Sequence, residues 1–130
     1  MNPGRRRAFV RSTGDEHGMV TAETAVVLPV LLLVLAGAVA AVTLVGAQLR
    51  CVDAAREGAR AAARGDTDAA VSAIAGRAAP DGAITAVTTS GEEVRVTVTA
   101  DVPALGVLPL RVRVSAEAVA LREPGAEDAG

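Results

Sequence analysis

An uninterrupted apolar run near the N-terminus constrains this chain more than any other feature. No charged residue occurs between Glu23 and Arg50, and residues 24–47 read TAVVLPVLLLVLAGAVAAVTLVGA. As a helix this stretch is about 36 Å long, against a bilayer hydrocarbon core of roughly 30 Å. The run is apolar on every side, and residues 48–130 are too few to cover it as a soluble core helix. The sequence therefore predicts one membrane-spanning helix.

Composition excludes several classes of function. The net charge is -2 and Phe9 is the only aromatic residue, which argues against a nucleic-acid binder. The single cysteine, Cys51, excludes an internal disulfide and a cysteine-built zinc site, and His17 is the single histidine. The sequence shows no nucleophile–base pair, no phosphate-binding glycine loop and no acidic cluster at metal-ligand spacing. We therefore expect neither an enzyme nor a bound cofactor or metal.

The N-terminal region, from the basic leader through the apolar run, admits two readings as an export signal. Ala38–Ala40 fits the small-residue pattern of a signal-peptide cleavage site, with the cut before Ala41. Arg6–Arg11 looks like a twin-arginine motif. Both readings are weakened because the apolar run is longer than an ordinary signal-peptide core of about 7–15 residues. Acidic residues also separate the basic cluster from the apolar run, namely Asp15, Glu16 and Glu23.

A third reading accounts for those acids. A basic leader, then Gly18, then an apolar helix with Glu23 as the fifth residue after that glycine resembles the processing site of type IV prepilins. The stretch 18–29 resembles the start of TadE-like proteins, which are minor pilin or pseudopilin components of the tight-adherence (Flp-type) pilus. Residues 48–60, QLRCVDAAREGAR, resemble the segment that follows the span in that family. The resemblance implies a TadE-like protein that takes part in pilus biogenesis or secretion.

The resemblance also implies a processing site and partners. A prepilin peptidase would cut between Gly18 and Met19 at the cytoplasmic face, so residues 1–18 would be a leader peptide. Glu23 would then meet the new amine of Met19 on a neighbouring pilin or pseudopilin subunit within the assembly machinery. A simpler alternative is that Glu23 only stabilises the helix dipole, by about 0.3–1 kcal/mol. Thr24 stands where major Flp pilins carry tyrosine, which favours a minor or pseudopilin role.

Packing and orientation follow from the span itself. Pro29 removes one backbone hydrogen bond and favours a kink. Small residues four apart, Ala36 with Ala40 and Gly37 with Ala41, permit close contact with another helix in the lipid. Arginines flank the span equally on both sides, so their count does not decide the topology. The short leader and the long C-terminal segment favour a cytoplasmic N-terminus and an extracytoplasmic C-terminal domain in the cell membrane.

The remaining chain predicts an α+β, pilin-like fold. We expect residues 19–64 to form the transmembrane and stalk helix, beginning at about Ala22, and residues 65–121 to form a small extracytoplasmic domain. Residues 122–130 are expected to be a disordered tail. Within the domain, a short helix and an antiparallel sheet of about three strands are expected at residues 68–79, 84–88, 94–99 and 110–118, with a loop at 101–109.

Several side chains of the stalk helix and the small domain allow two interpretations. Cys51 is expected to fill the core, although it could cross-link two chains. Three stalk arginines form either a solvated face or a strip for lipid headgroups or an acidic partner: Arg56, Arg60 and Arg64. Arg111 and Arg113 are expected to face acids such as Glu92, Glu93 or Glu117. A domain this small is marginal alone and should pack on the stalk helix or a partner. The alternative function is an uncleaved membrane anchor whose small domain binds a neighbour.

Overall fold

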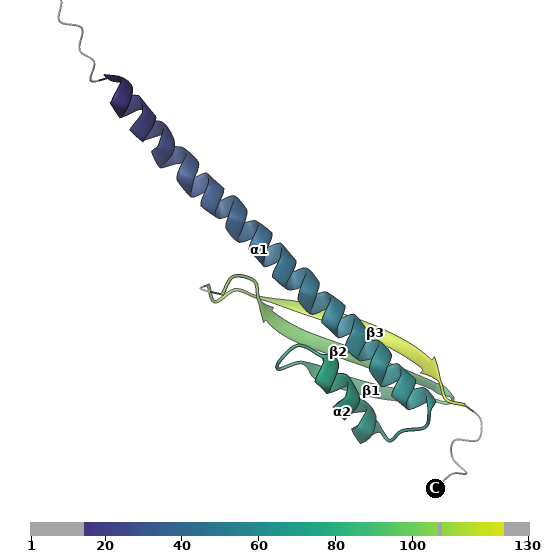
Figure 1. Ribbon diagram of the computed structural model, residues 1–130. Helices are drawn as coiled ribbons and strands as arrows, with labels where there is room; N and C mark the ends of the chain where they lie inside the picture. The colour runs from purple at the N-terminus through teal and green to yellow at the C-terminus, as the bar shows by residue number, and fades with distance from the viewer. Residues whose placement is uncertain (1–14, 107, 124–130) are drawn as a thin grey trace, which may run out of the picture. The chain divides into compact units, whose positions relative to one another are not determined.

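The computed structural model describes residues 15–106 and 108–123. It contains helix α1 (Asp15–Ala63), helix α2 (Asp68–Ala78) and three strands, which are β1 (Ile84–Ser90), β2 (Glu93–Pro103) and β3 (Arg111–Leu121) (Figure 1). The chain divides into two compact units between Ala36 and Gly37. The predicted α+β class, with a long first helix, a short second helix and a three-stranded antiparallel sheet, is confirmed.

Helix α1 is longer at its N-terminus than the sequence predicts. It begins at Asp15 instead of about Ala22, so the start of the apolar run is not the start of the helix. The other end is confirmed: Gly65 adopts φ 85°, and Asp66 N donates to Ala61 O at 3.2 Å. That geometry is a Schellman stop, in which glycine takes the left-handed conformation.

The sheet has the order β1-β2-β3 with both pairs antiparallel. In β2 the inward valines, Val94, Val96 and Val98, are fully buried while Arg95 is exposed, as the alternation predicts. The prediction of a loop at 101–109 is wrong for residues 101–103. Asp101 pairs with Arg113, and the pairing of β2 with β3 continues to Pro103. Only residues 104–110 connect β2 to β3.

The turns follow local chemistry. Thr67 caps α2, with its hydroxyl accepting from Ala70 N at 3.3 Å. In the turn after α2, Gly82 has φ 73° and Ala83 N donates to Pro80 O at 3.1 Å. Gly91, with φ 61°, opens the two-residue loop between β1 and β2. A glycine at this first position is typical of the hairpin turns that match strand twist.

The core of the domain lies between the sheet, α2 and the C-terminal half of α1. The helix contributes small side chains that are all buried: Ala47, Cys51, Ala54, Ala55, Ala59, Ala61 and Ala62. At Gly58 a Cβ would lie 2.9 Å from Val96 Cγ1 and 3.2 Å from Ala75 Cβ. The helix therefore approaches the sheet and α2 as closely as a glycine allows. The expectation that the domain packs on the stalk helix is confirmed.

Surface ion pairs differ from those expected. Arg113 Nε lies 3.1 Å from Asp101 Oδ1, and Arg95 pairs with Glu93 at 3.0 Å and with Glu117 at 2.9 Å. The prediction that Arg113 faces Glu92, Glu93 or Glu117 is therefore wrong. The register explains the difference, because Asp101 stands directly opposite Arg113. These exposed pairs contribute little stability.

Candidate functional site

The predicted processing residues lie on an open part of α1. A Cβ built at Gly18 would meet no atom within 4 Å, and Met19 is 74% exposed. Glu23 is also exposed. Residues four apart on a helix share one face, so Met19 and Glu23 lie on the same side. This side of the helix is accessible to another protein.

The Gly18–Met19 peptide bond lies inside the helix. Since α1 begins at Asp15, both residues are helical, and only about one turn precedes Met19. A peptidase that binds extended backbone would need this turn to unwind. Terminal turns open at little cost in free energy, so the bond is reachable through fraying. The sequence interpretation, which placed the helix start near Ala22, did not contain this requirement.

The position of Glu23 bears on the helix-dipole alternative. In the uncut chain Glu23 lies about two turns after Asp15, and dipole effects fade beyond the first turn. Glu23 would come within reach of a helix N-terminus only after cleavage at Met19. In the uncut chain, the helix dipole therefore does not explain an acid at this position.

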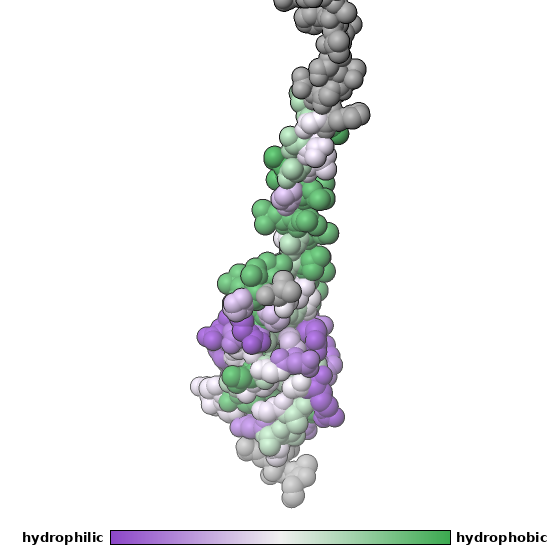
Figure 2. Space-filling view, turned by 90° about the vertical axis from the view of Figure 1, so that its left-hand side faces the viewer, coloured by the Kyte–Doolittle hydropathy of each residue, from purple (hydrophilic) through white to green (hydrophobic). Residues whose placement is uncertain are grey.

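The N-terminal part of α1 presents a bare apolar surface. Large exposed side chains surround it on all sides, among them Leu28, Leu31, Leu33, Val39 and Val42. The hydroxyls of Thr24 and Thr43 donate to Val20 O and Val39 O at 2.8 and 2.9 Å, so these polar groups are satisfied within the helix. Among the described residues, α1 is the one helix that is long and apolar enough to cross a membrane. Figure 2 shows its green surface and the hydrophilic purple surface of the domain.

The predicted helix-packing residues fall on two sides of α1. Pro29 lies within the helix, and Gly37 is exposed, with no atom within 4 Å of a Cβ built there. Ala41 is exposed, whereas Ala36 and Ala40 are half-buried. The Gly37–Ala41 side is therefore the more open of the two small-residue pairs.

The run Ala55–Arg60 combines a packing face with a solvated face. Ala55, Gly58 and Ala59 are buried, and Arg60 is exposed with its guanidinium 3.9 Å from Glu57. The sequence-based predictions gave Gly58 no role. The signal that could have found its role is its spacing from Ala54, Ala55 and Ala62, which repeats at three and four residues.

Cys51 lies in the core, as the filler interpretation predicts. Its side chain has no exposed surface, which leaves nothing for a cross-link to a second chain. Burial raises the pKa of the thiol, and the positive charge of Arg50 opposes this shift more weakly.

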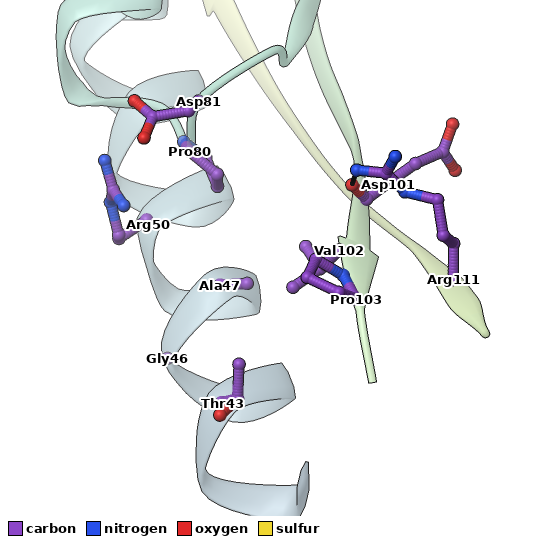
Figure 3. A pocket seen from close by; sticks show the side chains of 10 residues that line it. All are labelled: Thr43, Gly46, Ala47, Arg50, Pro80, Asp81, Asp101, Val102, Pro103 and Arg111. Atoms are coloured by element: carbon purple, nitrogen blue, oxygen red, sulfur yellow. Dashed lines mark hydrogen bonds between the residues drawn. The ribbon is translucent and has the colours of Figure 1, made fainter. Parts of the chain in front are cut away.

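A pocket of about 320 Å³ lies where α1, the turn after α2 and the end of the β2–β3 ladder meet (Figure 3). Its charged residues come from distant parts of the sequence: Arg50, Asp81, Asp101 and Arg111. Arg50 donates to Ala79 O at 2.8 Å, and Arg111 donates to Asp101 O at 3.3 Å. A hydrogen bond from Arg113 lowers the pKa of Asp101. Sequence reasoning did not find this pocket, because no local pattern connects its residues.

Comparison with known proteins identifies the family. The family model described as TadE-like protein matches residues 18–60. A protein of Mycobacterium tuberculosis (strain ATCC 25618 / H37Rv), named Apoptosis inhibitor Rv3655c, is 44% identical over 103 residues, covering 79% of this chain and 78% of the relative. The chain belongs to the TadE-like family.

Membership fits the geometry described above. The matched residues include the Gly18–Glu23 motif, the exposed apolar helix and the Ala55–Arg60 packing face. A TadE-like family match and an apolar N-terminal helix fit a membrane protein associated with the tight-adherence pilus. TadE-like proteins are structural, pilus-associated proteins and not a family of enzymes. No solved structure matches the chain.

Proposed function

We propose that this TadE-like chain is a minor pilin or pseudopilin that is processed by a prepilin peptidase and takes part in pilus assembly or secretion. It spans the cell membrane once, with its N-terminus cytoplasmic and its domain extracytoplasmic. The observation that carries the proposal is the combination of Gly18, Met19 and Glu23 on an open face of a bare apolar helix within the family-matched region. Its partners are the peptidase, membrane lipid, other pilin or pseudopilin subunits and the assembly machinery.

Cleavage creates the amine with which Glu23 of a neighbouring subunit pairs. Hydrolysis of the Gly18–Met19 bond gives Met19 a positively charged amine. A carboxylate at the edge of the hydrocarbon is costly unless it is paired. The amine of an adjoining subunit offsets that cost for Glu23, and the attraction is strong because the local dielectric constant is low. Pairing between subunits therefore sets the axial register of neighbouring helices.

Small residues support contact between the spans. Gly37 and Ala41 are exposed and four apart, so a second helix can approach the backbone closely there. Ala36, Ala40 and Pro29 lie in the same stretch, and a neighbouring subunit could satisfy the carbonyl that Pro29 leaves without its helical donor.

The mature N-terminus tests processing. Mass spectrometry of protein purified from the native cell is expected to show Met19 as the first residue. Replacing the residue before the cut (Gly18→Ala) is expected to leave the leader attached, because it adds a side chain at the cleavage point and favours the helix by about 1 kcal/mol. The matched control is Gly14→Ala, which should be processed normally. A wild-type chain that retains Met1 or Asn2 would contradict processing, and a chain beginning at Ala41 would indicate a signal peptide.

The pairing role of Glu23 needs a separate test. Glu23→Gln is expected to insert and to be cut normally but to lose incorporation into the assembled complex. A charge-assisted hydrogen bond contributes about 1.5–3 kcal/mol, which corresponds to roughly a 10- to 150-fold loss. Glu57→Gln, at another exposed glutamate of α1, is the matched control. Incorporation of the Glu23 variant at the wild-type level refutes the pairing role.

The alternative function is an uncleaved membrane-anchored envelope protein with a small interaction domain. The observation that favours it is the helical conformation around the Gly18–Met19 bond, which protects that bond until the first turn opens. An intact N-terminus on protein from cells that contain an active prepilin peptidase would support this alternative.

A further inference from the structure

The connection between β2 and β3 exposes apolar side chains where loops are usually polar. We call Leu105, Leu108, Pro109 and Leu110 the hairpin tip; Val107 lies outside the described residues and is not part of it. Leu108 and Leu110 are 54% and 56% exposed. The loop is nevertheless hydrogen-bonded, with Ala104 N donating to Leu110 O at 2.9 Å and Leu108 N to Leu105 O at 3.0 Å. Two neighbouring exposed leucines beside a hydrogen-bonded part of a loop indicate a contact surface.

Along the chain, the hairpin tip comes directly after the end of β2, which lies beside the apolar part of α1. Val102 and Pro103 line the same pocket as Thr43 and Ala47. Figure 3 shows both β2 side chains directed toward the helix at Ala47. In Figure 1 the connection between β2 and β3 points along α1, away from the C-terminal end of that helix. The hairpin tip therefore lies on the apolar side of Arg50, the first charged residue after the apolar run.

Burial along α1 agrees with this placement. Ala40 and Leu44, on one face, are half-buried, whereas Val42 and Val45, on other faces, are 74% and 59% exposed. One face of the helix is thus less exposed than the others at Ala40 and Leu44, beside the pocket-lining residues Thr43 and Ala47. Helix and hairpin together present apolar surface at the same level (Figure 2).

We propose that the hairpin tip inserts into the lipid leaflet on the domain side of the membrane, as a second membrane contact beside α1. The proposal rests on membrane insertion of α1, which both functions considered above share. The uncharged run Thr24–Leu49 is about 39 Å long as a helix, so it exceeds the hydrocarbon core by about 9 Å. Its last turns, and the hairpin tip beside them, then lie at the boundary between acyl chains and headgroups. Interfacial elements insert to about this depth, roughly 5–10 Å.

The charged residues next to the hairpin tip carry no net charge, so the leucines of the tip dominate its contact with the lipid. Arg111 follows Leu110 directly, and Arg50 lies across the pocket from it. Long arginine side chains suit this position because they extend their charge toward the headgroups. Asp81 and Asp101 line the same pocket, so positive and negative charges are balanced there. We therefore expect insertion to depend on the leucines and to be insensitive to salt.

The test measures depth in the bilayer with the full chain. A Cys51→Ala background receives one cysteine at a time, by Leu108→Cys or Leu110→Cys in the hairpin tip, Leu33→Cys in the span, or Ser90→Cys. Ser90 is the last residue of β1 and pairs with Glu93, at the end of β2 far from the hairpin tip. Each variant carries an environment-sensitive fluorophore and is reconstituted in phosphatidylcholine–phosphatidylglycerol vesicles. A fraction of the lipids bears a spin-label quencher, placed either near the headgroup or deep in the acyl chain.

Three results are distinguishable. Quenching at positions 108 and 110 by the shallow quencher, severalfold stronger than at position 90, together with deep quenching at position 33, supports the proposal. Quenching at 108 and 110 equal to that at 90, while 33 is quenched, overturns it; shielding of the tip from water without lipid quenching does so too and points to a protein contact. Lack of quenching at 33 refutes the membrane span itself, and with it both this proposal and the function above.

Discussion

The substitution Gly58→Ala tests whether α1 packs on the domain as described. Gly58 is buried, and the added methyl would lie 2.9 Å from Val96 Cγ1, 3.2 Å from Ala75 Cβ and 3.5 Å from Val71 Cγ1. Val96 is fully buried and branched at Cβ, so its methyl group cannot rotate freely away. Ala75 has no rotamer to change. The new methyl group therefore has to push elements apart.

Two opposing effects set the expected magnitude. Alanine favours a helix over glycine by about 1 kcal/mol, whereas overpacking a core costs about 1–3 kcal/mol. Gly58→Ala should therefore lower the free energy of unfolding by about 0–2 kcal/mol. The matched control is Gly76→Ala in α2, where the glycine is exposed and a Cβ would meet no atom within 4 Å. Gly76→Ala gains helix propensity without overpacking the core, so it should raise the free energy of unfolding by about 0.5–1 kcal/mol.

Cys51 provides the assay. It is the chain's single cysteine and is fully buried, so a maleimide can label it only when the domain opens. With the full chain in detergent micelles, a difference of about 1–3 kcal/mol between the two alanine variants corresponds to roughly a 5- to 150-fold difference in labelling rate. Gly58→Ala should label faster than wild type and Gly76→Ala slower.

A slower rate for Gly58→Ala, similar to that of Gly76→Ala, would refute the close approach. A second comparison uses Val96→Ala, which removes the nearest clashing methyl group. If the contact is correct, Gly58→Ala should be less destabilising in the Val96→Ala chain than in wild type, because the two residues are coupled.

Two further predictions concern stability. Thr67→Ala removes the hydroxyl that accepts from Ala70 N, so in a denaturant titration it should lower the free energy of unfolding by about 0.5–2 kcal/mol. The control Thr88→Ala, on the exposed face of β1, should change that free energy much less. Because burial raises the pKa of Cys51, ionisation of the thiol favours the unfolded chain: stability is complete below about pH 8.5, the usual pKa of a thiol, and falls as the pH rises above it. Unfolding midpoints at neutral and alkaline pH should show this extra loss in wild type but not in Cys51→Ala; an equal loss in both would contradict it.

Local sequence patterns located most elements of the fold. The strand at Val94, Val96 and Val98 and the end of the stalk helix near residue 64 reflect chemistry within a few residues, and the structure confirms both. The strand ends were predicted less well, because they depend on a partner far along the chain. Asp101 belongs to β2 since it pairs with Arg113, which a local pattern does not reveal.

The candidate sites divide in the same way. Gly18, Met19 and Glu23 are found by a motif, and their roles stay predictions that the N-terminus and incorporation experiments test. The hairpin tip reads locally as an ordinary loop, because Pro103, Gly106 and Pro109 favour turns. Its importance depends on tertiary structure, since only the packing of β2 beside α1 places Leu108 and Leu110 at the level of the apolar helix. The packing role of Gly58 was missed for the same reason.

The last strand finishes next to the C-terminal end of α1. Glu123 N donates to Ala63 O at 3.4 Å, and Arg122 N donates to Glu92 O at 2.8 Å. The chain therefore leaves the described part of the domain, at Glu123, from the end opposite Arg50 and the hairpin tip, which is the end from which a C-terminal reporter fusion would start. Such a fusion offers a way to image the protein in living cells while leaving its lipid-facing end unobstructed.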